Sequence, residues 1–257
     1  MFYHGGAGYK IYALIAAAGS ASRMGAAAGG VNKVYADLNG AAVILHSINK
    51  FAAVGFVDSV TAVIAPGGAA AFDKAVKNAP PVPVNKTTGG PSRGVSIYNG
   101  LKKIMESAAE EENSVVIIHD GARPNFRTCD LEAALKMFLS GDTGSFRPAG
   151  VVFASPSSDT LCKIDSRAMI EGYADRDKIY KIATPQIFDL NTIYGCFTKL
   201  EKINMSAALV FSDESSLAVH FGYRVGIYKC PSDNIKITTI EDLDYLKSIM
   251  KTESGVL

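Results

Sequence analysis

The sequence has no tryptophan, few cysteines, no long apolar run and almost no excess of charge of one sign. Its 257 residues include 26 Lys and Arg against 25 Asp and Glu, a formal net charge of +1. It therefore lacks the basic surplus that is typical of proteins that bind duplex nucleic acid. The apolar run Ile11–Ala18 ends at Gly19, well short of the roughly 20 residues that cross a bilayer. The composition predicts neither a nucleic-acid partner nor a membrane partner.

The cysteines are too widely spaced for a metal-binding or disulfide-rich protein. They stand at positions 129, 162, 196 and 230, with no Cys-x-x-Cys pair among them. Zinc sites and disulfide frameworks use closer and more regular spacings. The first ten residues also lack the basic and then apolar pattern of a signal peptide. We therefore expect a cytoplasmic protein with reduced thiols, and its 48% hydrophobic content predicts a globular core rather than disorder.

Apolar strands alternate with amphipathic helices along most of the chain. This alternation is typical of a three-layer α/β sandwich with a mostly parallel sheet, in which ligands bind beyond the carboxyl ends of the strands. The predicted strands are Ile11–Ala18, Val60–Ala65, Val115–Ile118, Val151–Ala154 and Arg224–Tyr228. Helical spacing is found over Val43–Val54, Val95–Met105, Leu131–Leu139, about Leu190–Ile203, Asp213–Phe221 and from about Ile240 onward.

The alternation breaks at about residues 155–187. This stretch is polar and contains short alternating pieces, such as Thr160–Ile164 and Lys178–Ile182, which favour antiparallel hairpins or an extended arm. We find no internal repeat and no low-complexity linker. The sequence thus predicts a single domain over residues 1–257 with an inserted β-arm.

The first candidate site is the run of small residues Ala17–Gly25, directly after the first predicted strand. Small residues let a ligand approach the backbone closely, and exposed N–H groups can bind phosphates. Arg23 and Lys33 would supply the positive charge for a triphosphate. The run fits neither the P-loop nor the dinucleotide-binding pattern. The alternative is a flexible surface turn with solvated basic residues.

The second candidate is Gly89–Ser96, between an extended segment and a helix. Paired glycines and a serine near a helix start suit contact with a base or a phosphate. The segment is equally typical of an ordinary turn in which Ser92 or Ser96 caps the helix.

The third candidate is His119–Pro124, at the end of a strongly apolar strand. Asp120 is well placed to hold Mg²⁺ against nucleotide phosphates, since Mg²⁺ favours one or two carboxylates plus phosphate oxygens. Arg123 could pair with a phosphate or orient Asp120. The alternative is a structural Asp–Arg pair in a turn. We expect His119 to pack or to form hydrogen bonds, because no Ser or Cys nucleophile motif accompanies it.

The fourth candidate is Asp233–Leu243. Thr239 and Asp242 have the spacing of a helix N-terminal capping box, which predicts a structural role. Lys236, just before the cap, either points into the site at the sheet edge or is an ordinary surface lysine.

Taken in order along the chain, these motifs resemble the 2-C-methyl-D-erythritol 4-phosphate cytidylyltransferase family over nearly the whole sequence. The resemblance has small departures, among them Ala21 and Gly121 where the family has a glycine and an alanine. Eight matching segments carry it: Ala17–Gly25 with Lys33; Gly89–Ser96; His119–Pro124; Asp159 and Thr160; Asp175 and Arg176; Thr184–Phe188; Asp213 and Glu214; and Asn234–Leu243.

The resemblance implies a Rossmann-like, GT-A-like nucleotidyltransferase fold and transfer of CMP from CTP to a sugar-alcohol phosphate, with Mg²⁺ as cofactor. It further implies a homodimer formed through the arm, whose Arg176 reaches the neighbouring subunit. The implied catalytic residues are Arg23, Lys33 and Lys236, and Asp120 is the implied metal ligand. Residues implied in CTP binding are Ala16, Ala17, Ala18, Gly19, Gly90, Arg93, Ser96 and Asp120. Those implied in binding the sugar phosphate are Arg123, Thr160, Arg176, Thr184 and Ser212.

Three other functions remain open at this point. A ribitol-5-phosphate cytidylyltransferase has very similar nucleotide motifs, although Asp175, Arg176 and the segment Thr184–Gln186 favour the erythritol enzyme. A non-catalytic nucleotide-binding module is disfavoured because Arg23, Lys33, Asp120 and Lys236 are all retained. A Rossmann oxidoreductase is weakened by the imperfect glycine pattern.

Overall fold

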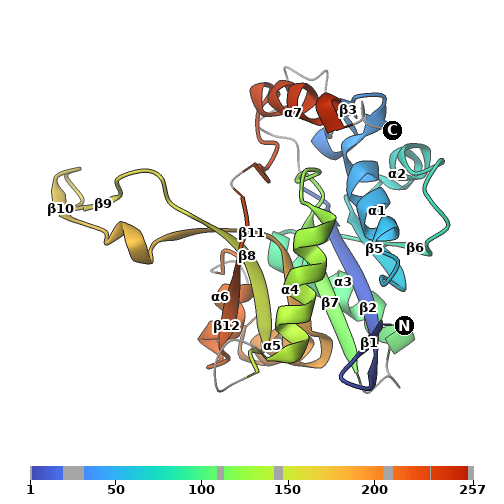
Figure 1. The fold of residues 1–257 in the computed structure, drawn as a ribbon, viewed down its shortest axis with the longest axis horizontal. Coiled ribbons are helices and arrows are strands. Elements are labelled where there is room, and N and C mark those ends of the chain that lie inside the picture. The colour runs from blue at the N-terminus through green and yellow to red at the C-terminus, as the bar shows by residue number, and fades with distance from the viewer. Residues whose placement is uncertain are drawn as a thin grey trace.

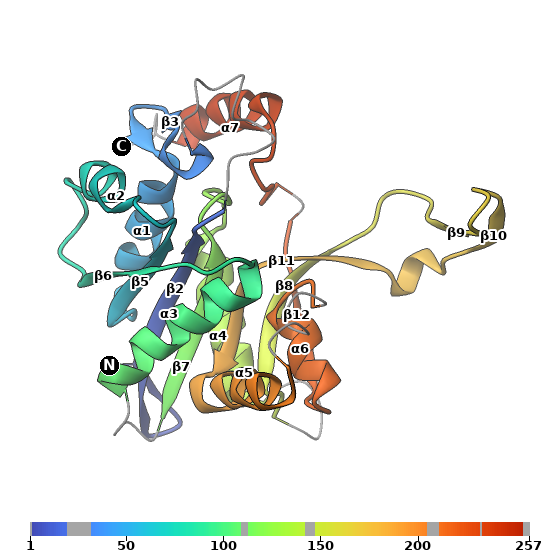
Figure 2. The same cartoon turned by 180° about the vertical axis from the view of Figure 1, so that it is seen from behind.

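The fold is a twisted sheet covered by helices on both faces, with a long arm at one side (Figures 1 and 2). The computed structural model describes residues 2–19, 32–108, 113–141, 147–204, 211–231 and 233–253. Over these ranges, no helix has the length and apolarity that a membrane span requires.

The sheet has eight strands in the described ranges, in the order β12-β8-β11-β7-β2-β5-β6, with β1 paired to β2. β11 is antiparallel to both its neighbours and β1 is antiparallel to β2, while the other pairs are parallel. This confirms the predicted α/β class with a mostly parallel sheet. The strands are β1 (Phe2–His4), β2 (Ala7–Ala17), β5 (Ser59–Ile64), β6 (Val84–Thr88), β7 (Ser114–Asp120), β8 (Gly150–Pro156), β11 (Tyr180–Asp189) and β12 (Val225–Lys229).

Two apolar clusters, one on each face, form the core. Along β2, Ile11, Ala13 and Ile15 belong to one cluster, whereas Tyr12 and Leu14 belong to the other, because successive side chains of a strand point to opposite faces. The first cluster is covered by α1 (Val43–Ala53), α2 (Ala69–Ala75), α4 (Thr128–Ser140) and α7 (Ile240–Glu253). The second is covered by α3 (Arg93–Ala108), α5 (Leu190–Asn204) and α6 (Glu214–His220).

α7 lies beyond the carboxyl edge of the sheet, next to the short hairpin of β3 (Asp37–Leu38) and β4 (Ala41–Ala42) (Figure 1). The predicted box at its start is present: Thr239 N donates to Oδ2 of Asp242 at 2.9 Å, and Asp242 N donates to Oγ1 of Thr239 at 3.4 Å. The segment that carries Lys236 is therefore held directly before a capped helix.

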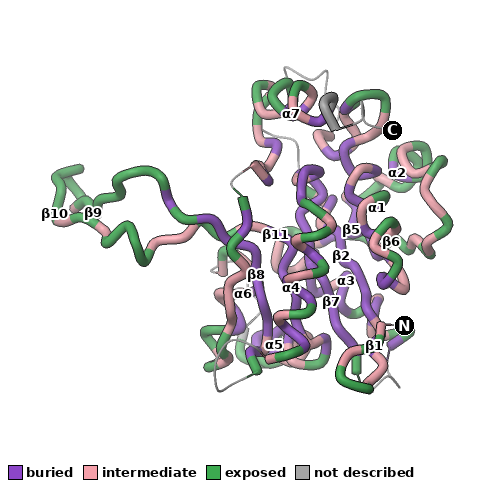
Figure 3. Tube along the Cα trace, in the orientation of Figure 1, coloured by how far each residue is buried: buried purple, intermediate pink, exposed green. Residues whose placement is uncertain are grey.

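The predicted arm is present and protrudes from the sheet between β8 and β11. It carries the antiparallel pair β9 (Cys162–Ile164) and β10 (Ile170–Tyr173) and the short helix η2 (Arg176–Lys178). Most of its residues are exposed (Figure 3).

The end of the arm differs from the predicted boundary at residue 187. The whole of β11, Tyr180–Asp189, belongs to the sheet, where Gln186 pairs with Ile118 of β7 and Val152 of β8. Thr184 and Gln186 are buried, and these polar residues break the apolar pattern from which a central strand is recognised. Their polarity is explained by the site that they support, because Thr184 contacts Asp120 and Gln186 contacts Asp213.

Candidate active site

The parallel strands bring the separate sequence motifs to one edge of the sheet. In the strand register, Ala16 of β2 lies beside Asp120 of β7, and Ala17 lies beside Ile64 of β5, which in turn pairs with Thr88 of β6. The residues that follow these strands therefore meet at the carboxyl edge. This is the edge at which open α/β sheets bind ligands.

Gly89 allows the loop after β6 to lie directly against the loop after β2. A Cβ at Gly89 would lie 2.3 Å from the Cβ of Ala18 and 2.8 Å from Oγ of Ser96, so no larger residue fits without displacement. Gly90 N donates to Oγ of Ser96 at 3.0 Å, and Val95 N donates to Oγ of Ser92 at 3.2 Å. Ser92 therefore caps α3, while Ser96 fixes the turn at Gly90.

Gly19, directly after β2, is joined to Asn32 by a hydrogen bond. Asn32 Nδ2 donates to the backbone oxygen of Gly19 at 3.0 Å, and Lys33 follows as the first residue of the short helix η1 (Lys33–Tyr35). Lys33 is half-buried at this position. Arg23 lies in the stretch 20–31, outside the described residues.

Asp120 is the centre of a cluster of positive charge. Its Oδ2 lies 2.9 Å from Nζ of Lys236 and 3.4 Å from Nε of Arg123, and its Oδ1 lies 3.3 Å from both Nε and Nη2 of Arg93. The fourth motif thus joins the third through Lys236. Burial by itself would raise the pKa of Asp120, but these three cations outweigh it and hold the pKa well below its ordinary value. The carboxylate is ionised at neutral pH.

Arg123 has two partners in this cluster. Besides Asp120 it contacts Asn234, to whose backbone oxygen its Nη1 donates at 2.8 Å. Asn234 is itself buried, and its Nδ2 donates to the backbone oxygen of Thr184 at 2.8 Å. Arg123 therefore orients Asp120 and fixes the segment that carries Lys236.

His119 is a core residue, as predicted. It is fully buried between Phe51 and Phe126, whose ring centroids lie 5.5 and 4.8 Å away. Its Nδ1 lies 3.2 Å from Oγ1 of Thr184, and its Nε2 lies 3.0 Å from the backbone oxygen of Arg123. Burial lowers the pKa of His119 to about 3, so the ring is neutral near pH 7.

The residues predicted to bind the sugar phosphate are only partly gathered in one chain. Thr184 is buried beneath Asp120, whose backbone N donates to its Oγ1 at 3.0 Å. Thr160 and Arg176 are exposed on the arm, and Ser212 is exposed directly before Asp213, the N-cap of α6. Within the described ranges, the structure gives no contact between these last three residues and Asp120.

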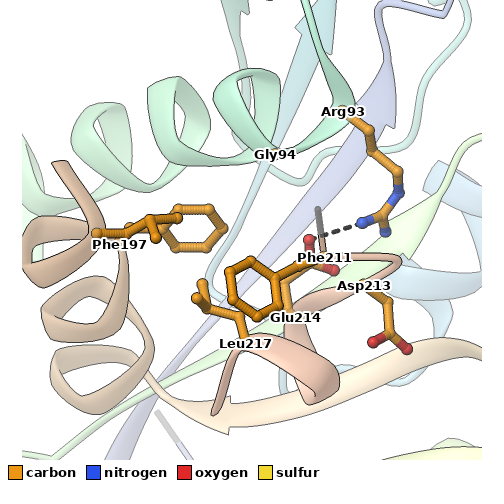
Figure 4. Close-up of a pocket in the computed structure, with 8 residues that line it drawn as sticks. Arg93, Gly94, Phe197, Phe211, Asp213, Glu214 and Leu217 are labelled. Carbon is orange, nitrogen blue, oxygen red and sulfur yellow. Dashed lines mark hydrogen bonds and ion pairs between the residues drawn. The ribbon is translucent and has the colours of Figure 1, made fainter. Parts of the chain in front are cut away.

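Sequence reasoning assigned no role to Glu214, yet it is the other carboxylate that contacts Arg93. Its Oε1 accepts a hydrogen bond of 2.6 Å from Nη1 of Arg93, across a narrow pocket lined also by Phe197, Phe211 and Leu217 (Figure 4). Burial raises the pKa of Glu214, whereas Arg93 favours the charged form. The only sequence feature that pointed to Glu214 was its position next to Asp213. No local sequence pattern connects it to Arg93.

A metal ion would find one carboxylate at this edge. Among the described residues, no three His, Cys, Asp or Glu side chains are grouped so that they could hold a metal ion by themselves. Asp120 therefore fits a cation that is shared with the phosphates of a bound nucleotide, the usual arrangement for Mg²⁺.

Comparison with known proteins identifies the family. The family model for 2-C-methyl-D-erythritol 4-phosphate cytidylyltransferase matches residues 11–252. Proteins of that name from Bacillus velezensis and Clostridium kluyveri are 31% identical over 244 residues and 33% identical over 259 residues. These alignments cover 94% and 95% of this chain and 96% and 98% of the relatives.

The fold comparison agrees. A solved structure of 4-diphosphocytidyl-2C-methyl-D-erythritol synthase from Anaerococcus prevotii matches with a TM-score of 0.74 at 25% identity, over 94% of this chain and 98% of that one. The family match, the close relatives and the cluster around Asp120 lead to one conclusion: the chain belongs to the 2-C-methyl-D-erythritol 4-phosphate cytidylyltransferase family.

Proposed function

We propose that this protein transfers a cytidylyl group from CTP to 2-C-methyl-D-erythritol 4-phosphate and releases pyrophosphate, the reaction of isoprenoid-precursor synthesis that the family is named for. The observation that carries the proposal is the cluster of Arg93, Arg123 and Lys236 around Asp120. It lies beside a glycine-rich turn at the ligand-binding edge of the sheet, where a nucleoside triphosphate needs positive charge.

The chemistry requires no general base. The phosphate oxygen of the sugar phosphate attacks the α-phosphorus of CTP, an oxygen–phosphorus bond forms, and the bond to the β-phosphate breaks with release of pyrophosphate. The attacking phosphate is already ionised near pH 7, so catalysis consists of positioning and charge stabilisation. The neutral, buried His119 is consistent with this mechanism.

Each basic residue has a place in the proposed reaction. Lys236 neutralises the charge that develops on the α-phosphate, which is where a fixed donor lowers the barrier most. Arg23 and Lys33 hold the triphosphate. The cytosine lies against backbone and small side chains, which are Ala16, Ala17, Ala18, Gly19, Gly90 and Ser96.

Asp120 is the proposed ligand of Mg²⁺. When bound, Mg²⁺ neutralises phosphate charge and helps to orient the triphosphate. Arg93 and Arg123 hold the carboxylate of Asp120 in place, since together they contact both of its oxygens.

The sugar phosphate binds in a pocket that two subunits share. Arg123, Thr184 and Ser212 come from one subunit, and Thr160 and Arg176 of the arm reach the site of a second copy. The exposed apolar side chains of the arm support pairing with another chain, because solvent exposure of so many is unfavourable in a monomer. They are Leu161, Ile164, Met169, Ile170, Tyr173 and Ile182.

One assay tests the proposed activity. Pyrophosphate release is measured with CTP and Mg²⁺, with 2-C-methyl-D-erythritol 4-phosphate or D-ribitol 5-phosphate added in turn. We expect release with the erythritol phosphate. Release with ribitol phosphate alone would identify a ribitol-5-phosphate cytidylyltransferase. No release with either sugar phosphate would indicate a non-catalytic nucleotide-binding module. NADH consumption in a parallel reaction would indicate an oxidoreductase.

A further inference from the structure

Glu214 is a deeply buried carboxylate that the proposed reaction does not use. Its residue exposure is 1%, and buried carboxylates persist only when they are paired. Its partner is Arg93, which reaches across from the start of α3 (Figure 4). This buried ion pair lies next to Asp120, the proposed metal ligand. It therefore affects how much of the positive charge of Arg93 acts on Asp120.

Arg93 is divided between two carboxylates. Nη1, at one edge of the guanidinium, donates to Glu214 at 2.6 Å, whereas Nε and Nη2, at another edge, both lie 3.3 Å from Oδ1 of Asp120. Charge-assisted hydrogen bonds are strongest at the short distances. Glu214 is therefore the main partner of Arg93, and Asp120 is the weaker one.

Glu214 is itself held firmly in place. Asp213, directly before it, caps α6 by accepting a hydrogen bond from Ser216 N at 2.9 Å, and its Oδ2 accepts another from Nε2 of Gln186 at 2.9 Å. Gln186 belongs to the central strand β11. The backbone that carries Glu214 is thus anchored to the sheet through Asp213, which limits how far its carboxylate can follow Arg93 toward Asp120.

We propose that Glu214 is a positioning residue that limits how far Arg93 neutralises Asp120, and that it thereby sets the affinity of Asp120 for the divalent cation that accompanies the nucleotide. The inference rests on the proposed function, because it concerns the metal requirement of that reaction. A cation that binds Asp120 must compete with Arg93, Arg123 and Lys236. Without the charge of Glu214, Arg93 shifts toward Asp120 and becomes a stronger competitor.

This role has an effect that loss of structure would not produce. Neutralising Glu214 makes the site more positive, which weakens metal binding at Asp120 and leaves the binding of metal-free CTP unchanged or tighter. A merely structural defect at the start of α3 would loosen the turn at Gly89 and Gly90, and it would weaken CTP binding with and without metal alike.

The test is Glu214→Gln, which keeps the shape and an acceptor for Nη1 of Arg93 but removes the charge. Calorimetry measures the dissociation constant of CTP in EDTA and in excess Mg²⁺. We expect the gain in affinity from Mg²⁺ to fall about tenfold, since one neighbouring charge typically shifts an equilibrium by one pKa unit or more. The Mg²⁺ concentration for half-maximal pyrophosphate release should rise by a similar factor, while kcat in excess Mg²⁺ stays within about threefold of the wild type.

Glu201→Gln is the matched control. Glu201 is a carboxylate of α5 that contacts Lys102 and Tyr98, and the structure gives it no contact with Asp120 or Arg93 within the described ranges. We expect this variant to retain the wild-type Mg²⁺ dependence.

Two results overturn the inference: an unchanged Mg²⁺ gain in Glu214→Gln, or equal weakening of CTP with and without Mg²⁺. If Glu214→Gln does not fold, Glu214→Asp takes its place. The aspartate carboxylate lies one methylene farther from Arg93 than that of Glu214. The gain in CTP affinity from Mg²⁺ should therefore fall at least threefold, and an unchanged gain contradicts the inference. The proposed function is refuted if the wild-type protein binds Mg²⁺ and CTP but releases no pyrophosphate. The role of Glu214 is then still tested by calorimetry, because that measurement needs binding only.

Discussion

Nζ of Lys236 lies 2.9 Å from Oδ2 of Asp120, so the proposed α-phosphate contact and the proposed metal ligand form an ion pair in the structure. The Lys236 side chain is 37% exposed, against 10% for Asp120. The carboxylate is therefore fixed, whereas the lysine can turn toward a ligand. We expect Lys236 to exchange Asp120 for a phosphate oxygen when CTP binds.

Lys236→Ala should lower kcat by about 10²- to 10³-fold, the usual loss when one fixed donor to a developing charge is removed. KM for CTP should change less, because other residues hold the triphosphate. The measurement is steady-state pyrophosphate release. Lys247→Ala, which removes a lysine paired with Asp244 on the exposed side of α7, should behave as the wild type. A near-normal kcat in Lys236→Ala would contradict the assigned role.

Gly89→Ala should raise KM for CTP at least tenfold. The added Cβ would lie 2.3 Å from the Cβ of Ala18, so the loops after β2 and β6 must move apart, and contacts to the base are lost. Kinetics at varied CTP give the measurement.

Gly195→Ala, in α5, is the control for this change. A Cβ there meets no atom within 4 Å, and Ala in place of a helical Gly stabilises by about 0.4–1 kcal/mol. We expect unchanged kinetics and equal or higher thermal stability. If Gly89→Ala binds CTP as tightly as Gly195→Ala does, close contact between the two loops is not required.

His119 should make the metal-free protein less stable in mild acid. Its pKa is about 3 in the folded state, against 6.5 as the ordinary value, so between these values the unfolded chain binds more protons. The free energy of unfolding therefore falls as the pH drops from about 7 to 4, by up to about 1.4 kcal/mol per pH unit from this residue. Urea unfolding at a series of pH values measures the slope.

His119→Gln should reduce that slope, because glutamine does not titrate. The variant is expected to lose stability at pH 7, since the contacts with Phe51 and Phe126 change, but to lose less on acidification. Equal slopes in the two proteins would show that folding does not lower the pKa of His119.

Arg176→Ala should raise KM for the sugar phosphate at least tenfold, the usual effect of losing a charged contact to a phosphate, and leave KM for CTP unchanged. Because the site is proposed to be shared, mixing this variant with Lys236→Ala should restore activity, as one site of each mixed dimer then has both residues intact. The readout is activity after the subunits are exchanged. An active monomer in light scattering would contradict the shared site.

The sequence was sufficient to predict the elements whose patterns are local. The apolar runs Ile11–Ala18 and Val115–Ile118 predicted β2 and β7, and the break after Ala154 predicted the arm. The position of β11 between β7 and β8 could not be predicted in the same way, because Thr184 and Gln186 are polar residues in a buried strand. Their burial is explained only by hydrogen bonds to residues far away in the chain.

The N-terminal hairpin and the Arg93–Glu214 pair were likewise not predicted. β1 and β2 turn at Gly5 and Gly6, both at positive φ, and this turn joins a short strand to a long one without a distinct apolar pattern. Arg93 and Glu214 are 121 positions apart, and they meet because α5 packs against both α3 and α6. Local patterns specify elements, whereas pairings of this kind depend on the assembled fold.

Cytidylyl transfer to 2-C-methyl-D-erythritol 4-phosphate is the claim that ³¹P NMR of the products can test in a single experiment. With CTP, Mg²⁺ and 2-C-methyl-D-erythritol 4-phosphate, we predict the paired resonances of a new diphosphate ester together with an equal amount of pyrophosphate. The signal of the sugar phosphate should disappear at the same rate. Release of CMP and pyrophosphate with the sugar phosphate left unchanged, or a diphosphate ester formed only from D-ribitol 5-phosphate, would contradict the claim.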